Sequence, residues 1–258
     1  VSQLTTQELN QLRELAVKAA STAGEYVQSQ FEGDYLKKKK TGGDSLASQV
    51  VTAVDFKAQE VILDLLDDSI AQYDFGLLTE EQPDNHSRFQ KEYFWCIDPL
   101  DGTLPFSEYR SGYAVSIALV ARGGDPVVAA VCIPDLNLVY STYKGSGSVL
   151  EGDQILHRDV AESKVHFYMD QSLQSEPYYP GLLQSVNEWT SKRNLRLILH
   201  ARYGGVRNAI GVLTSFRGFY VKYPKQKKGC GSIWDYAATR LFFEESGRIV
   251  STANDKDC

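Results

Sequence analysis

The sequence is poor in the residues that usually hold zinc, and the few it has are scattered. They are the cysteines Cys96, Cys132, Cys230 and Cys258 and the histidines His86, His157, His166 and His200. No cysteines form a CxxC pair and no histidines an HExxH pattern, which argues against a zinc site of the usual spacing. We expect the cysteines to be free thiols in a reducing compartment.

Long apolar runs and an excess of positive charge are also missing. No run approaches the roughly 20 apolar residues of a membrane-spanning helix, and no signal peptide is recognisable at the start. The chain carries 27 lysines and arginines against 33 acidic residues, a net charge of −6, so its composition is not that of a nucleic-acid-binding protein. We expect a cytoplasmic protein with a small-molecule substrate, and neither a membrane nor a nucleic acid polymer as partner.

Three common motifs of phosphate and ester chemistry are absent as well. The chain contains no GxxxxGK[ST], GxGxxG or GxSxG, which argues against a P-loop, a dinucleotide-binding turn and a serine nucleophile elbow. The glycine-rich stretch GSGSVLEG (145–152) lies between two strand-like runs, and we interpret it as a hairpin. Any phosphate chemistry must therefore depend on other groups.

The N-terminal part of the chain predicts two helices joined by a loop. Thr5 and Glu8 have capping-box spacing, and from Leu9 onward apolar residues recur at three- and four-residue intervals, which predicts an amphipathic helix. The polar stretch EGDYLKKKKTGGDS (32–45) is predicted to be a loop, either a solvated turn or a substrate-binding arm. A second helix is expected from about Thr52.

The pattern then changes to short apolar runs separated by turn residues, which is typical of strands. Strands are predicted at 75–79, 93–97, 113–121, 126–133 and 138–143, with the run 111–150 forming an antiparallel meander. Further along, helices are predicted within 177–194, 205–216 and 232–247, and strands at 195–200 and 218–223. Clustered strands followed by alternating strands and helices indicate an α+β or layered α/β fold. We expect one compact unit of two subdomains, an α+β part over 1–150 and an α/β part over 151–258.

The most informative stretch is WCIDPLDGTLPF (95–106), in which Asp98 and Asp101 follow an apolar run. Asp-Pro and Asp-Gly favour tight turns, so a purely structural turn is one interpretation. The other is a metal site, because buried carboxylates repel one another unless a cation lies between them. Magnesium prefers hard oxygen ligands, and the backbone carbonyl of Leu100 adds one more oxygen. Two such ions would share one bridging carboxylate.

Phosphate can be bound directly after these aspartates. Gly102 and Thr103 are predicted to open a helical turn whose free N–H groups can hold an anion. Pro105 fits a first turn, because it lacks an N–H group that would have no partner there. The same stretch therefore suits a phosphate held beside a pair of magnesium ions.

Other acidic residues stand at junctions between predicted elements, where catalytic groups often lie. Each also has a structural interpretation. Asp55 has capping-box spacing from Thr52. The pair Glu80 and Glu81 can be a solvated turn, and Asp235 can be a first-turn acid that the helix dipole stabilises. From the residues alone these alternatives stay open.

Four stretches together resemble the inositol monophosphatase family of magnesium-dependent, lithium-inhibited phosphatases, which includes the 3′(2′),5′-bisphosphate nucleotidases. They are VTAVDFKAQEVI (51–62), LLTEE (77–81), WCIDPLDGTLPF (95–106) and GSIWDYAAT (231–239). The resemblance implies a layered αβαβα sandwich that hydrolyses a small phosphate monoester with two or three Mg²⁺ ions and is inhibited by Li⁺. It is also compatible with a homodimer.

The resemblance gives the acidic candidates roles as metal ligands. Glu80, Asp98 and the carbonyl oxygen of Leu100 would hold the first Mg²⁺. Asp98, Asp101 and Asp235 would hold the second, with Asp98 as the bridge.

The same resemblance assigns the remaining roles. Gly102 and Thr103 would bind phosphate through their backbone N–H groups, and Asp235 would also contact the substrate. Asp55, Glu80 and Thr103 would orient the attacking water.

The choice of substrate depends on a more variable part of the chain. The stretch YPKQKKGCG (223–231) is more basic than its counterpart in typical inositol phosphate enzymes. We expect an inositol monophosphate or a related sugar phosphate. The alternative is 3′-phosphoadenosine 5′-phosphate, whose second phosphate and adenine would meet, by residue type, Lys225, Lys227 or Lys228 and Tyr203 or Tyr223. A non-catalytic, metal-binding regulator is a third hypothesis, which the intact set of acidic residues disfavours.

Overall fold

The computed structural model describes residues 3–32, 34–156, 163–222 and 231–251, with the side chains of 32–52 outside this description. The helices are α1 (Thr6–Glu32), α2 (Asp34–Tyr73), α3 (Thr103–Ser107), α4 (Tyr179–Ser191), α5 (Gly205–Thr214) and α6 (Ile233–Glu245). A seven-stranded sheet contains β1 (Gly76–Thr79), β2 (Tyr93–Asp101), β3 (Ala114–Ala121), β4 (Pro126–Ile133), β5 (Leu138–Tyr143), β6 (Leu150–Glu151) and β7 (Gln154–Ile155). A three-stranded sheet contains β8 (Lys164–Met169), β9 (Arg196–His200) and β10 (Gly218–Val221).

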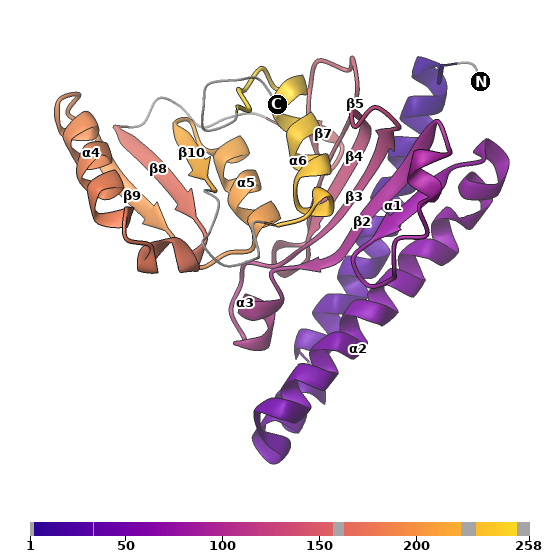
Figure 1. Cartoon of the computed structure of the whole chain (residues 1–258), viewed down its shortest axis with the longest axis horizontal. Helices are drawn as coiled ribbons and strands as arrows, with labels where there is room; N and C mark the ends of the chain where they lie inside the picture. Colours follow the sequence, from indigo (N-terminus) through magenta and orange to yellow (C-terminus); the bar gives the residue numbers. More distant parts are fainter. Residues whose placement is uncertain (1–2, 33, 157–162, 223–230, 252–258) are drawn as a thin grey trace.

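These elements stack in five layers (Figure 1). Helices α1 and α2 cover one face of the large sheet, and α6 with α5 covers the other. The small sheet packs against α5, and α4 lies on its outer side. Because helices cover both faces of the large sheet, β2, β3 and β4 are buried almost throughout rather than on alternate residues. The layered αβαβα sandwich expected from the sequence is confirmed.

The large sheet confirms the predicted meander. Strands β3, β4 and β5 pair antiparallel in sequence order, so that Ala130 faces Ile117 on one side and Ser141 on the other. The hairpin predicted at the glycine-rich stretch joins β5 to β6. Gly145 and Gly147 have φ angles of 85° and 67° there, a region that side chains rarely adopt.

The N-terminal prediction was half right. The capping box is present, because the Thr5 N–H donates to Glu8 Oε2 at 2.8 Å and the Glu8 N–H donates to Thr5 Oγ1 at 3.3 Å. The loop predicted at 32–45 was wrong, since α2 begins at Asp34 and includes the four lysines. Lysine is a good helix former, and a helix that is polar all round cannot be told from a solvated loop by composition.

The C-terminal half matches the predicted helices and strands, apart from one omission. Strand β8 was not predicted, although it is the central strand of the small sheet and pairs parallel with β9 and β10. Among the described residues, Cys96 and Cys132 are buried free thiols, as expected. No helix in the described part of the chain is both long and apolar enough to cross a membrane.

Candidate active site

Strand β2 ends in two buried carboxylates. Asp98 is 1% and Asp101 8% exposed, and the register with β3 shifts between them. The Asp98 carboxylate accepts a hydrogen bond from the N–H of Leu100 at 3.0 Å. The turn and the metal site were posed as alternatives from the sequence, and the structure shows an irregular end of strand β2 rather than a separate turn, with both carboxylates in one acidic cluster.

Helix α6 brings a third carboxylate to the same place. One ligand oxygen from each of Asp98, Asp101 and Asp235 lies within 4.8 Å of the other two. Asp235 is also part of a capping box, in which its Oδ2 accepts the N–H of Ser232 at 2.8 Å. The helix-start interpretation is therefore correct too. The cap uses Oδ2 of Asp235, so the helix start does not occupy Oδ1.

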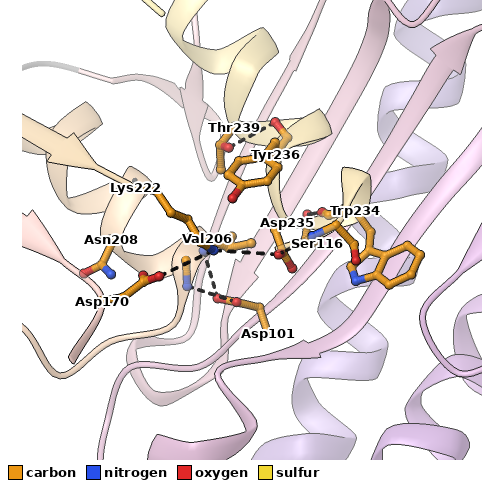
Figure 2. Close-up of polar contacts among 12 residues, drawn as sticks. Asp101, Ser116, Asp170, Val206, Asn208, Lys222, Trp234, Asp235, Tyr236 and Thr239 are labelled. Atoms are coloured by element: carbon orange, nitrogen blue, oxygen red, sulfur yellow. Dashed lines mark hydrogen bonds and ion pairs between the residues drawn. The ribbon is translucent and has the colours of Figure 1, made fainter. Parts of the chain in front are cut away.

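Asp101 joins the site to helix α5 (Figure 2). Its Oδ1 accepts the N–H of Gly205 at 3.0 Å and its Oδ2 accepts the N–H of Val206 at 2.9 Å. Two N–H groups that the helix leaves unpaired are satisfied in this way. A Cβ atom at Gly204 would collide with this carboxylate, so the close approach requires glycine.

The site is strongly acidic. Burial raises the pKa of Asp98 well above its usual range, and the neighbouring Glu80 and Asp101 raise it further. Burial, followed by repulsion from Asp235, raises the pKa of Asp101 to about 7. Glu80 hydrogen-bonds Asp98, and desolvation raises its pKa although part of the residue is exposed. Without a cation, these groups resist ionisation.

This donor set fits magnesium. The cluster offers carboxylate oxygens, the hard ligands that Mg²⁺ prefers. A divalent cation would also remove the repulsion that now raises the pKa values of these groups. Asp98, Asp101 and Asp235 lie close enough together to hold such an ion, and Glu80 hydrogen-bonds one of them, Asp98.

Asp55 and its neighbour Gln59 connect α2 to this cluster. Asp55 lies within α2 rather than at its start, so its capping box with Thr52 was wrong. It is 6% exposed, and burial, followed by repulsion from Glu81 and Glu80, raises its pKa to about 8. One turn later, Gln59 Oε1 accepts the N–H of Glu81 at 3.3 Å. The helix thereby holds the turn after β1 beside the metal candidates.

The helical turn predicted at Gly102 and Thr103 is present. Gly102 precedes α3 with a φ of 85°, and a Cβ atom there would lie 2.7 Å from the carbonyl oxygen of Gly112. The hydroxyl of Thr103 donates to the carbonyl of Leu100 at 3.3 Å. The N–H groups of Gly102 and Thr103, proposed to bind phosphate, therefore lie in the same turn as the Leu100 carbonyl, which is proposed as a metal ligand.

One charged cluster beside the site was not predicted. Lys222, directly after β10, lies between Asp170 and Asp235 (Figure 2), and Tyr220 donates a hydrogen bond to Asp170 at 2.7 Å. The run KVHFYM (164–169), although His166 interrupts it, ends in Asp170 as β2 ends in an acid, and this is a weak sequence signal for β8 and its carboxylate.

The aromatic and basic substrate candidates are not brought together in the described part of the chain. Lys225, Lys227, Lys228 and Tyr223 lie outside the described residues. Tyr203 lines a cavity of about 560 Å³ together with His200 and Arg202. Asp235 and Lys222 line a different cavity, of about 770 Å³.

Comparison with known proteins agrees with this geometry. The model of the inositol monophosphatase family matches residues 8–257. The chain belongs to this family. It is similar in fold to inositol monophosphatase II from Staphylococcus aureus, with a TM-score of 0.71 and 19% identity over 96% of this chain and 86% of that one.

The curated relatives of this chain include proteins of two different names. The chain is 34% identical to Nus factor SuhB of Salmonella typhimurium over 54% of this chain and 49% of the relative. It is 31% identical to the putative Nus factor SuhB of Neisseria meningitidis serogroup A over 96% and 90%. It is 32% identical to the 3′(2′),5′-bisphosphate nucleotidase CysQ of Shigella flexneri over 49% of each chain. The chain thus spans about half the length of the Salmonella and Shigella relatives in these matches.

Proposed function

We propose that the protein is a Mg²⁺-dependent phosphatase of a small phosphate monoester, with an inositol monophosphate or a related sugar phosphate as the first candidate. The observation that supports this most is the convergence of Asp98, Asp101 and Asp235 directly beside the turn at Gly102 and Thr103. A cation site next to free backbone N–H groups is suited to a phosphate group, whose charge would otherwise be repelled by the acidic residues.

The metal-binding residues follow the family roles. Glu80, Asp98 and the Leu100 carbonyl would hold one Mg²⁺, and Asp98, Asp101 and Asp235 another. Bound Mg²⁺ would screen the phosphate charge and make water a stronger nucleophile at neutral pH.

The other residues position the reactants. The N–H groups of Gly102 and Thr103 would bind phosphate oxygens and fix the direction of attack. Asp55 and Glu80, when ionised, would accept hydrogen bonds from the attacking water, and the Thr103 hydroxyl would complete its orientation. Holding both reactants in this way removes much of the entropic barrier to their reaction.

A phosphate-release panel tests the proposal. Inositol 1-phosphate, glucose 1-phosphate and 3′-phosphoadenosine 5′-phosphate are compared in Mg²⁺ and in EDTA. We expect release that requires Mg²⁺ and is lost in Asp98→Asn. If the wild-type protein releases phosphate from none of them in Mg²⁺, the proposal fails.

Two alternatives have specific support. Similarity to CysQ, together with the cation at Lys222, favours a bisphosphate nucleotide as substrate. Similarity to proteins named Nus factor SuhB favours a regulatory role that keeps the metal site. The panel separates these alternatives when the Tm is also measured with and without Mg²⁺. A bisphosphate nucleotidase releases phosphate fastest from the nucleotide. A non-catalytic regulator releases none, although Mg²⁺ raises its Tm.

A further inference from the structure

A second cavity is lined by other residues than the acidic cluster. Its volume is about 560 Å³, and none of the proposed metal ligands lines it. The residues around it come from the loop between α3 and β3, from a short 3₁₀ helix (Gln171–Ser175) and from the end of β9 with the segment that follows it. Its polar side chains are Arg110, Ser111, Gln174, His200, Arg202 and Tyr203. None of the described residues that line it is acidic, so its wall is positively charged in a chain whose net charge is −6.

The two arginines of this cavity retain capacity to bind an anion. Within the described part of the chain, the guanidinium of Arg202 has no hydrogen bond or ion pair. Arg110 pairs with Glu108 through its Nε at 2.9 Å, and its Nη1 donates to the carbonyl oxygen of Arg202 at 3.3 Å. Each guanidinium carries five N–H donors, so both still have donors for a ligand. Glu108 offsets part of the charge of Arg110, and Arg202 is therefore the stronger cation of the two.

The walls of the cavity are held in place by neighbouring segments. The N–H of Gly204 donates to the carbonyl oxygen of Gly112 at 2.7 Å, and a Cβ atom at Gly112 would lie 2.6 Å from Cδ1 of Tyr203. The loop before β3 and the segment before α5 are therefore in close contact. On the β9 side, His200 Nε2 lies 2.9 Å from His166 Nδ1. A ligand would thus enter a site that needs little ordering, which lowers the free-energy cost of binding.

The donors of the cavity favour a phosphate group as the ligand. A guanidinium presents a planar fork of N–H donors that matches the oxygens of phosphate, and a phosphate has enough oxygens for two forks, whereas one fork already occupies a carboxylate. A volume of about 560 Å³ is also within the range of small-molecule sites. We propose that this cavity binds a phosphate group, free or carried by a small molecule, between Arg110 and Arg202 and independently of the metal site.

Calorimetry with metal-free protein tests the proposal. The protein is treated with EDTA, dialysed, and titrated with inorganic phosphate, ribose 5-phosphate or acetate at an ionic strength fixed with KCl, which keeps screening constant. We expect at least one of the two phosphates to bind with a Kd of about 1 mM or tighter and acetate to bind at least about tenfold more weakly. Tighter binding of ribose 5-phosphate identifies a phosphorylated small molecule as the ligand, and equal binding identifies free phosphate.

A matched pair of arginine variants assigns the binding to this cavity. Arg202→Gln should weaken phosphate binding at least about tenfold, the effect of one charge-assisted contact. Arg196 is also exposed but lies at the opposite end of β9, and Arg196→Gln should change the Kd by less than about twofold. If Arg202→Gln is poorly folded, Arg202→Lys replaces it, and we expect a smaller loss of about threefold because lysine keeps the charge without the fork.

Three outcomes would overturn the proposal. The first is that neither phosphate binds the metal-free protein, or that the Arg202 and Arg196 variants weaken binding equally. The second is that binding requires Mg²⁺ and is lost in Asp98→Asn, which would assign the phosphate to the metal site. The third is that sedimentation shows a dimer that Arg202→Gln dissociates while phosphate does not bind, which would make this face a contact with a second copy of the chain. Binding that persists in metal-free Asp98→Asn would support a separate site.

Discussion

Asp101 accepts a hydrogen bond from the backbone N–H of Val206 at 2.9 Å, although the two residues are 105 positions apart in the chain. A carboxylate of the candidate metal site therefore also fixes the start of α5. Gly205 donates to the other oxygen of the same carboxylate at 3.0 Å. The end of strand β2 and the start of helix α5 are thus held together by one side chain of the candidate metal site, so a change of Asp101 should affect stability as well as the site.

Asp101→Ala should lower the free energy of unfolding even without metal. The change leaves the N–H groups of Gly205 and Val206 without their acceptor, at a cost of roughly 1–3 kcal/mol. Relief of acidic repulsion opposes this cost in both Asp101→Ala and Asp101→Asn, and Asp101→Asn should be the less destabilising of the two because its amide oxygen can still accept one of the two N–H groups. Chemical denaturation in EDTA measures both. Asp67→Ala, at an exposed position of α2, serves as the control and should change stability by less than about 0.5 kcal/mol.

Mg²⁺ should remove most of the pH dependence of stability between about pH 6 and 8. The pKa of Asp55 is raised to about 8 and that of Asp101 to about 7, against about 3.9 in an unfolded chain. Between about pH 6 and 8 the folded metal-free protein therefore binds more protons than the unfolded protein, and its stability falls as pH rises. Mg²⁺ binding requires ionised carboxylates, so its stabilising effect should increase over the same interval.

Thermal unfolding in EDTA and in Mg²⁺ at the two ends of that interval tests this expectation. Asp55→Asn should flatten the decline in EDTA, because one of the two titrating groups is removed. A metal-free protein that becomes more stable toward the alkaline end would contradict the raised pKa values.

Much of the fold was predictable because local patterns and burial agree. Strand β4 was predicted with its observed ends, since both its faces are covered and its apolar run is continuous. Strand β8 was missed, because His166 interrupts its apolar pattern and is placed by a partner in another strand. His166 Nδ1 lies 2.9 Å from His200 Nε2 of β9, a contact that no local pattern predicts.

The sequence indicated which residues belong to the candidate site, but not which of them contact one another. Asp98 and Asp101 can be identified from the sequence because they follow an apolar run. Asp235 has only the pattern of a first-turn acid, and its place in the site becomes clear from the packing of α6 against β2. Lys222 was missed because its significance comes from Asp170 and Asp235, which are 52 and 13 positions away along the sequence. Local patterns indicate which residues are unusual, but only the packing of the layers shows which of them meet.

Glu245 should stabilise the β5–β6 hairpin without affecting catalysis. Its carboxylate accepts the N–H of Gly145 at 2.8 Å and that of Gly147 at 2.7 Å. Glu245→Ala should cost about 1–2 kcal/mol of unfolding free energy and speed hydrogen exchange at both glycines. Glu244→Ala, which removes only an i,i+4 pair with Arg240, should cost about 0.5 kcal/mol or less. Equal stability of the two variants would show that the hairpin does not depend on Glu245.

Lithium should inhibit turnover if the family's metal chemistry applies here. A small, hard, singly charged cation can occupy an oxygen site built for Mg²⁺ while supplying less charge to stabilise phosphate. We expect inhibition at millimolar concentrations of LiCl, measured against KCl at equal ionic strength to control for screening. Activity that requires Mg²⁺ but is unaffected by LiCl would contradict this prediction.

Asp98→Asn should abolish turnover while preserving the fold, because Asp98 is the carboxylate proposed to bridge both ions. The amide keeps the size of the side chain and its oxygen can still accept the N–H of Leu100, a contact of 3.0 Å in the wild type. It also removes a buried acid whose pKa is raised well above its usual range, so the metal-free variant should be at least as stable as the wild type. Phosphate release and the rise in Tm on adding Mg²⁺ should both be lost together. Retention of more than about a tenth of the wild-type kcat, a change in activation free energy of only about 1.4 kcal/mol, would contradict the bridging role of Asp98.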